Sequence, residues 1–522
     1  MGVARTHRMR GWVRRFVSPK LRQRGHARQH QKRPLAISAF DPASPRLRRD
    51  PATPSTWIVL WRDEPLEALL LAGLILGLAW APLWLGGDRP FAWGVNGVWF
   101  PGLTVVYEIS LLIRERKHPV AAKQILAPLI LFAAVVFWIS VQMSTVIPPG
   151  FAHPIWLIAG DALKTPLNAA ISVNPQASAL ALMRLLTDAS VLWLAMQLCR
   201  SPRRALILIQ AVVAICAAYS LLGIVMMVFA GGALPFSDLA GGGAIRATFV
   251  NRNTFATYAG IGLVGAVALI LRFYRREAPG DPALKSYRLA RLIEATGQSG
   301  WTLIGAGLVI LVALLGTVSR GGVLAAVLAI FTLLLMTFAR SGRRDGQQID
   351  MVIFLAVAVL GGFLLFGDKI VGRISETGLT DASRLAVCAI VIGSINDALF
   401  IGFGYGTFAD IFPLYRDQSI SVWGMWDMAH NTYLETLQGL GIAFGGALIL
   451  ALALLVWRCA WGAVQRHRDA TAPIVAASVS LLIGAHAMVD FSLQIEAVAL
   501  TFMAILGAGV AQSESSRRLA SD

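Results

Sequence analysis

The sequence predicts an all-α integral membrane protein with about twelve transmembrane helices and one large loop, residues 368–437, between the ninth and tenth helices. Of the 522 residues, 56% are hydrophobic and only 14% are charged, and the mean hydropathy is +0.64. This composition is too apolar for a soluble domain. The apolar residues form runs of roughly 17 to 25 positions, the length of a membrane-crossing helix. Alternation at the period of a strand is absent, so a membrane β-barrel is not expected.

Residues 1–64 form a basic tail that carries Arg and Lys throughout and contains no apolar run long enough for a signal-peptide core. We interpret the tail as a disordered cytoplasmic segment. A transit peptide or a segment that contacts anionic headgroups would have a similar composition, and both alternatives stay open. The net charge of +17 does not indicate nucleic acid, because the basic residues lie between apolar runs and do not gather on one face with aromatic residues.

Twelve apolar runs lie within residues 65–512, and each is interpreted as a transmembrane helix. They occupy residues 66–86, 94–113, 124–146, 179–199, 205–229, 254–273, 301–318, 321–339, 351–367, 438–457, 474–490 and 493–511. Clusters of Arg and Lys follow every second run, and the positive-inside rule places these clusters in the cytoplasm. Both termini, including the tail at 513–522, are then cytoplasmic. The segments that face outward are 147–178, 230–253, 319–320 and 368–437.

The loop at 368–437 is the one long segment on the predicted outer side. It contains many aromatic side chains, among them Trp423 and Trp426, and few charges, so we expect it to fold against the membrane surface. Residues 384–395 carry apolar side chains at helical spacing, which predicts a short interfacial helix. The segment 148–178 is a second candidate for an interfacial or re-entrant element.

Arginines on the predicted outer side need a reason, because each of them opposes the orientation signal. They are Arg246, Arg252, Arg320, Arg384 and Arg416. Arg320 stands in the shortest outer turn, so its guanidinium must lie near membrane depth, where a charge costs about 3 kcal/mol. A partner or an anionic ligand would offset this cost, and Gly321 and Gly322 permit a close backbone approach. The alternative is a loop arginine whose side chain extends to water.

His430 precedes the tenth predicted helix. If Asp427 caps that helix, His430 lies in its first turn, where the positive end of the helix dipole disfavours a protonated ring. A neutral imidazole can accept a proton from a substrate hydroxyl. A lone histidine is more often structural, but the outer arginines and the folded loop favour a functional one.

Guanidinium groups and a neutral histidine together indicate one class of reaction. Guanidinium groups bind a diphosphate by paired hydrogen bonds and stabilise it as a leaving group, and a neutral histidine is a base for an attacking hydroxyl. The outer segments contain no acidic cluster for Mg²⁺ or Mn²⁺, and the four cysteines include no CxxC pair, so neither a metal nor another cofactor is expected. A membrane enzyme would obtain such a donor as a polyprenyl diphosphate.

Two further patterns are weaker. Residues 402–406 contain three glycines and predict a tight turn, because a phosphate loop would need a following lysine and a strand-loop-helix setting. His486 and Asp490 stand four residues apart in the eleventh predicted helix, so their side chains should face the same way. A hydrogen bond between helices and a functional role are equally open for this pair.

Several short motifs resemble the O-antigen ligase and Wzy-type polymerase superfamily of bacterial inner-membrane glycosyltransferases. The similar segments are 247–253, 319–324, 383–385, 402–408, 430–431 with Gly441, and 489–491. They occur in the order and topology of that superfamily, and the resemblance extends over roughly residues 60 to 512.

The resemblance implies a metal-independent glycosyltransferase in the inner membrane with a periplasmic active site. Arg320, Arg384 and Arg252 would bind the diphosphate of an undecaprenyl-diphosphate-linked glycan, and His430 would activate the acceptor. The residues expected in supporting positions are Asn431, Arg246, Arg416 and Asp490. The acceptor would be lipid A core, a growing polysaccharide or a protein, and the motifs do not separate a ligase from a polymerase.

Two other functions are compatible with twelve helices. A secondary transporter usually places charged residues near the midplane in repeated halves, whereas here they cluster at the outer surface. A lipid-linked glycan flippase needs the same diphosphate recognition but no base.

Overall fold

The computed structural model describes residues 64–233, 243–277, 300–340, 382–420, 426–466 and 469–514. All of these belong to one compact unit, Ser55–Asp522. The basic tail up to residue 63, the predicted helix at 351–367 and Trp423 lie outside the described residues. The proposed boundaries of the tails and of the membrane domain at 65–512 stay predictions.

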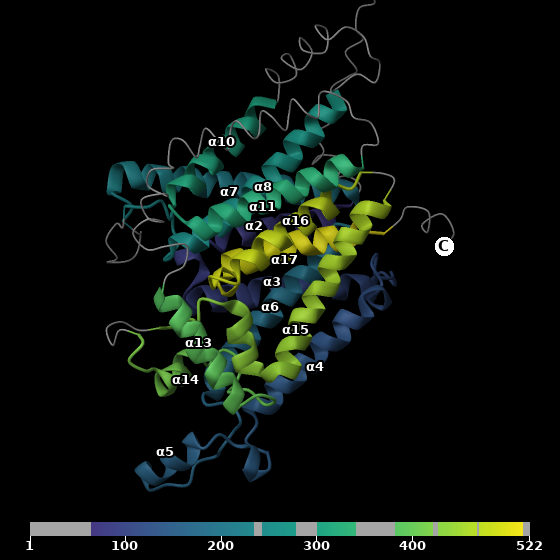
Figure 1. The fold of residues 1–522 in the computed structure, drawn as a ribbon. Helices are drawn as coiled ribbons and strands as arrows, with labels where there is room; N and C mark the ends of the chain where they lie inside the picture. The colour runs from purple at the N-terminus through teal and green to yellow at the C-terminus, as the bar shows by residue number, and fades with distance from the viewer. Residues whose placement is uncertain are drawn as a thin grey trace, which may run out of the picture. The chain divides into compact units, whose positions relative to one another are not determined.

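The described residues form α-helices and short 3-10 helices and contain no strand, which confirms the all-α class. The α-helices are α2 (Pro65–Trp80), α3 (Pro90–Ile113), α4 (Leu126–Met143), α5 (Ile155–Leu163), α6 (Pro175–Leu198), α7 (Pro202–Ala230), α8 (Arg252–Glu277), α10 (Trp301–Gly316), α11 (Arg320–Ala339), α13 (Ala382–Asp397), α14 (Phe408–Tyr415), α15 (Thr432–Gln465), α16 (Thr471–His486) and α17 (Glu496–Ala511) (Figure 1). The 3-10 helices are η1 (Leu85–Gly87), η2 (Ala122–Ile125), η3 (Pro149–Phe151) and η5 (Ser492–Gln494).

Every predicted apolar run except 351–367 coincides with one of these helices. In the described part of the chain, seven helices are long and apolar enough to cross a membrane, and four shorter helices are also apolar. A membrane protein is therefore supported, while the count of twelve spans stays a prediction.

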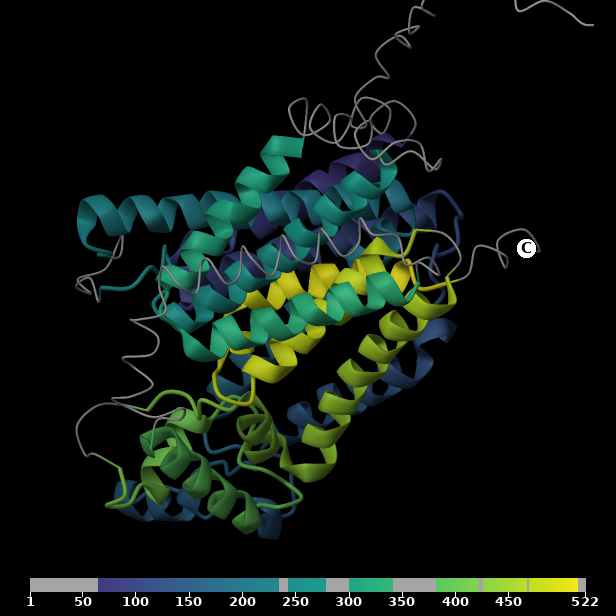
Figure 2. The same cartoon turned by 45° about the horizontal axis from the view of Figure 1, so that its top comes forward.

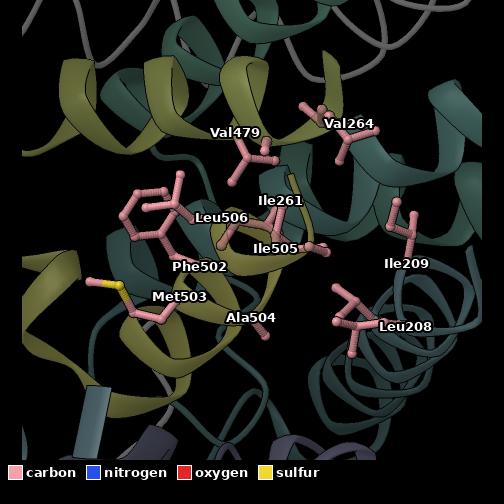
Figure 3. Packing of buried hydrophobic residues seen from close by; sticks show 14 of the residues in the cluster. Leu208, Ile209, Ile261, Val264, Val479, Phe502, Met503, Ala504, Ile505 and Leu506 are labelled. Carbon is pink, nitrogen blue, oxygen red and sulfur yellow. The ribbon is translucent and has the colours of Figure 1, made fainter. Parts of the chain in front are cut away.

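The main hydrophobic core is built around α8 and α17, whose side chains are buried over most of their length. Figure 3 shows Ile261 of α8, Val479 of α16 and Leu506 of α17 meeting inside this core. Small residues bring the helices close together: a Cβ added at Gly509 would lie 2.2 Å from the Cβ of Ala476. Such small-residue contacts are typical of helices that pack within a membrane, where close approach replaces the hydrophobic effect as the driving force.

The segment between α13 and α15 has a hydrophobic core of its own. Helix α13 confirms the helix that the apolar spacing at 384–395 predicts, and it lies beside α14 (Figure 1). Val387 and Val391 of α13 pack against Phe408 and Phe412 of α14. The described part of the predicted outer loop is therefore folded, and its contact with a membrane surface stays a prediction. The same holds for α5, which exposes its apolar side chains.

Helix α15 is broken at Gly441, which has φ +76° and ψ 165°. The ribbon of α15 changes direction along its length in Figure 2, as the backbone angles of Gly441 require. The amide of Ile442, which the break frees, donates to the carbonyl of Leu399 at 2.8 Å, and the amide of Gly404 donates to Gly439 at 3.0 Å. Residues 402–406 thus form a tight turn packed against the break, as the sequence predicts, and the turn stabilises the bent helix.

Arginine side chains cap the C-terminal ends of neighbouring helices. Their guanidinium groups donate to carbonyl oxygens as follows: Arg204 to Leu198, Arg275 to Thr337, Arg340 to Ala463 and Arg466, Arg466 to Gln512, and Arg200 to Ala511. The last carbonyls of a helix have no intrahelical partner and carry partial negative charge, so cationic donors stabilise them. These arginines belong to the basic clusters that are predicted to face the cytoplasm.

Candidate functional site

The candidate site surrounds residues 487–491, which connect α16 to η5 and are called the connecting segment below. The first turns of α11 and α13 and the residues before α15 lie around this segment. Thr432 at the start of α15 bonds to it twice: its amide donates to Ala487 at 2.9 Å, and its hydroxyl donates to the carbonyl of Asp490 at 3.2 Å.

Asn431 is the N-cap of α15. Its side-chain oxygen accepts hydrogen bonds from the amides of Tyr433 and Leu434, both at 3.1 Å. Its side-chain nitrogen donates to the carbonyl of Met488 at 3.0 Å, which ties the cap to the connecting segment. The prediction that Asp427 caps this helix is wrong, because Asn431 satisfies the free amides four residues later.

His430 consequently lies before the helix and not in its first turn, so the helix-dipole argument for a neutral ring does not apply. Its backbone has φ +53°, a left-handed conformation that costs a non-glycine residue energy. The ring lies between two aromatic rings, with centroids 5.6 Å from Trp426 and 4.9 Å from Phe491. The side chain is 18% exposed, so the ring is held in place while one part of it stays accessible.

Asp490 faces His430. Its Oδ1 lies 3.7 Å from His430 Nδ1, and the carboxylate is fully buried. Its other oxygen accepts a hydrogen bond from Ser492. A carboxylate beside Nδ1 favours the tautomer that carries its proton there, and Nε2 is then left as the base. The carboxylate thus selects the tautomer of the ring, which differs from the part that the sequence-based argument gave to the helix dipole, namely to disfavour the protonated form.

His486 and Asp490 do not share a helix, so the prediction that they lie one turn apart is wrong. Helix α16 ends at His486, and Asp490 follows in the connecting segment. A chain of hydrogen bonds nevertheless joins them: Thr257 Oγ1 lies 2.5 Å from His486 Nδ1 and donates to Ser492 Oγ at 3.0 Å, and Ser492 donates to Asp490.

Arg320 and Arg384 approach the same segment from two helix starts. Arg384, in the first turn of α13, donates from Nη1 to the carbonyl of Val489 at 2.9 Å. Arg320 is the first residue of α11, where Ser319 caps the helix. A Cβ added at Gly321 would lie 3.1 Å from the His486 ring, which shows how closely this turn of α11 approaches the end of α16. The structure thus gathers Arg320, Arg384 and His430 around residues 486–491, while their roles stay predictions.

The other predicted arginines lie elsewhere. Arg252 begins α8 and Arg246 precedes it, and both line a cavity of about 1320 Å³. Burial lowers the pKa of the Arg246 guanidinium. None of the described residues that line this cavity is Arg320, Arg384 or His430. Arg416 follows the last residue of α14, Tyr415.

Polar residues that the sequence analysis did not select line the same cavity. Arg184 of α6 forms an ion pair with Glu496 of α17, with 3.6 Å between Nε and Oε1, and its guanidinium lies 4.5 Å above the Trp93 ring. Asp188 follows one turn after Arg184. Charged residues inside an apolar run are the signal that would have found them.

Among the described residues, no group of three or more His, Cys, Asp or Glu side chains could hold a metal ion. Metal independence of the reaction itself stays a prediction. The carboxylate nearest to His430 is engaged with the imidazole and with a serine hydroxyl.

Comparison with protein families gives one result that bears on this site. Residues 305–450 match the family model described as O-Antigen ligase. The matched segment includes Arg320, Arg384 and His430, while Arg252 and Asp490 lie outside it. A search of curated proteins gave no match. Over residues 305–450 this match confirms the resemblance that the motifs predict, and in that segment the chain is similar to the O-antigen ligase superfamily.

Proposed function

We propose that this protein transfers a glycan from undecaprenyl diphosphate to an acceptor hydroxyl at the periplasmic face of the bacterial inner membrane. The family match supports glycan transfer of the O-antigen ligase or polymerase type in general. The observation that carries the specific proposal is the gathering of Arg320, Arg384 and His430 around the connecting segment.

The two arginines would bind the donor diphosphate. Each stands in the first turn of a helix of at least 16 residues, where free amides and the helix dipole also favour an anion. Planar guanidinium groups form paired hydrogen bonds with phosphate oxygens. As the bond between sugar and diphosphate breaks, negative charge grows on the leaving group, and the same donors stabilise it.

His430 would serve as the base and Asp490 would hold it in position. The acceptor oxygen attacks the anomeric carbon of the donor, and its proton passes to His430 Nε2. The bond from that carbon to the diphosphate oxygen breaks, and undecaprenyl diphosphate leaves with the bonding electrons. Asp490 stabilises the imidazolium formed in this step, as carboxylates do in His-Asp pairs.

Alanine variants test this proposal in a strain with a defined surface glycan. We expect Arg320→Ala, Arg384→Ala and His430→Ala each to lower product at least about 100-fold while the protein still inserts, because these side chains serve the transition state. Matched controls are Arg116→Ala and His118→Ala, which remove the same side chains from an exposed loop. Normal glycan display in all three variants would refute the proposal. Full activity of His430→Ala alone would indicate a flippase, which needs no base.

A further inference from the structure

A second, smaller cavity lies far from the connecting segment. It has a volume of about 280 Å³ and is formed where α8 and α11 end and α16 begins. These three helices pack against one another (Figure 1). The connecting segment lies at the opposite ends of α11 and α16, so the two sites belong to opposite sides of the predicted membrane. In the predicted orientation, this cavity is on the cytoplasmic side.

Three arginines line this cavity. Arg272 of α8 forms an ion pair with Asp469, which precedes α16. Arg275 of α8 donates from Nη2 to the carbonyl of Thr337 in α11 at 3.1 Å. Arg340 directly follows α11, and its charge lies close enough to that of Arg275 for the two to repel each other. In the described lining, three guanidinium groups thus share the cavity with one carboxylate, that of Asp469.

Helix capping does not account for the whole of these guanidinium groups, each of which has five N–H donors. Capping of Thr337 takes one donor from Arg275, and capping of Ala463 and Arg466 takes two from Arg340. A phosphate accepts at most two hydrogen bonds from one guanidinium, so it can bind while the caps stay in place. An anion between Arg275 and Arg340 also offsets their mutual repulsion.

The lining changes from charged to apolar within one helical turn. Ala268 and Leu271 lie one turn before the arginines of α8, and Ile474 lies one turn after the start of α16. Because α8 ends at the cavity and α16 begins there, all three side chains lie on the membrane side of the arginines. Arg275 is exposed, so the charged rim is accessible from water. A charged rim above an apolar floor fits a ligand with an anionic and an apolar part.

We propose that this cavity binds the phosphate of an anionic phospholipid from the cytoplasmic leaflet, with Arg275 and Arg340 as the phosphate-binding residues. Anionic lipids give that leaflet its negative surface potential, and basic pockets between transmembrane helices bind their headgroups. A soluble phosphate ester has the same phosphate but no chain to meet the apolar floor. The inference does not rest on glycan transfer, because binding is measured without turnover.

Native mass spectrometry of the delipidated full chain tests the site. The probe is dioleoyl phosphatidylglycerol. Dioleoyl phosphatidylcholine has the same chains and a phosphate but no net charge, and dioleoylglycerol has no phosphate. We expect the tightest phosphatidylglycerol site to have a Kd at least about tenfold below that of either comparison lipid, because only this probe brings a net negative charge to the guanidinium groups. Glycerol 1-phosphate in about tenfold excess should not displace it.

Arginine variants assign the binding to this cavity. Arg275→Gln and Arg340→Gln should each weaken the tightest site about tenfold. Arg275→Lys should bind with intermediate affinity, because it keeps the charge and loses the planar pair of donors. The matched controls are Arg114→Gln and Arg116→Gln, which remove the same charge from an exposed loop on the same predicted side. Both controls should bind like the wild type.

A variant that should gain affinity separates binding from misfolding. Asp469→Asn removes the carboxylate from the rim and keeps an oxygen for the amide and hydroxyl of Thr471. We expect it to bind phosphatidylglycerol about threefold more tightly. Asp417→Asn is the matched control, because Asp417 accepts from the amide and hydroxyl of Ser419 in the same way and lies away from the cavity.

Three results would overturn the inference. Equal affinity for phosphatidylglycerol and phosphatidylcholine would mean that the cavity does not recognise the charge. Displacement of the lipid by glycerol 1-phosphate would mean that a soluble phosphate ester is the ligand and that the apolar floor contributes nothing. Wild-type affinity in Arg275→Gln, Arg340→Gln and Asp469→Asn alike would place the tightest lipid site elsewhere.

Discussion

The pair formed by His430 and Asp490 is the smallest unit on which the proposed chemistry depends. At 3.7 Å between Nδ1 and Oδ1, a small rotation of the imidazole completes the hydrogen bond. Asp490→Asn should lower the transfer rate by about 10²-fold or more, because the ring then loses its preferred tautomer and the stabilisation of its charged form. The measurement is initial rate with purified protein, and donor affinity should stay unchanged.

Asp397→Asn is the matched control for this variant. Asp397 accepts a hydrogen bond from Tyr415 at 2.9 Å at the contact between α13 and α14, outside the connecting segment. Burial raises the pKa of Tyr415 to about 12, so this hydroxyl stays a donor over the whole assay range. A wild-type rate in Asp490→Asn would remove the carboxylate from the mechanism.

At the scale of single residues, the sequence reveals arginines that oppose the positive-inside rule. It hides charged residues that form ion pairs with each other. Arg320 and Arg384 stand out because they lie on the predicted outer side, where basic residues are few. Arg184 and Glu496 escape notice because an apolar window averages over them, and only the fold shows that they meet. The sequence alone does not decide which residue caps α15, because Asp and Asn are both good N-cap residues. In the structure the cap is Asn431, whose side chain also donates a hydrogen bond to Met488.

Among the elements, α15 is the one whose shape the site requires. Gly441→Ala should destabilise the protein by more than about 1 kcal/mol and reduce transfer, since φ is +76° and an added Cβ would lie 2.4 Å from the carbonyl oxygen of Phe400. Gly446→Ala, five residues later in the same helix, meets nothing within 4 Å and should leave stability unchanged or slightly higher.

Fluorescence-detected size-exclusion chromatography after heating gives the melting temperatures of both glycine variants. Equal melting temperatures would mean that the break at Gly441 is not needed for stability.

Helix positions follow from hydropathy, but the break in α15 does not. The predicted run at 438–457 includes Gly441 and the residues after it, and it misses the six residues 432–437 with which the helix begins. The backbone of residues 398–404, some distance earlier in the chain, accepts a hydrogen bond from the amide of Ile442 and donates to the carbonyl oxygens of Gln438 and Gly439. A local pattern contains no signal for such a distant partner, and for the same reason it extended the eleventh helix past His486 to Asp490.

For the whole molecule, the proposed function requires that the connecting segment face the periplasm. In a Cys388→Ser background, Ser419→Cys should react with a membrane-impermeant maleimide in intact cells, whereas Arg116→Cys should react only after lysis. Both positions are exposed, and the cysteines at 199, 216 and 459 are buried. The reverse pattern would place His430 in the cytoplasm and exclude the proposed donor chemistry.

The connecting segment lies between α16 and α17, later in the chain than every predicted donor-binding arginine and the histidine. During synthesis the segments that carry those side chains are therefore made before the connecting segment around which they lie. On the proposed mechanism, an incomplete chain that lacks the connecting segment and α17 can neither hydrolyse the lipid-linked donor nor transfer its glycan to a wrong acceptor. Reactivity begins only when the closing pair of helices is in place.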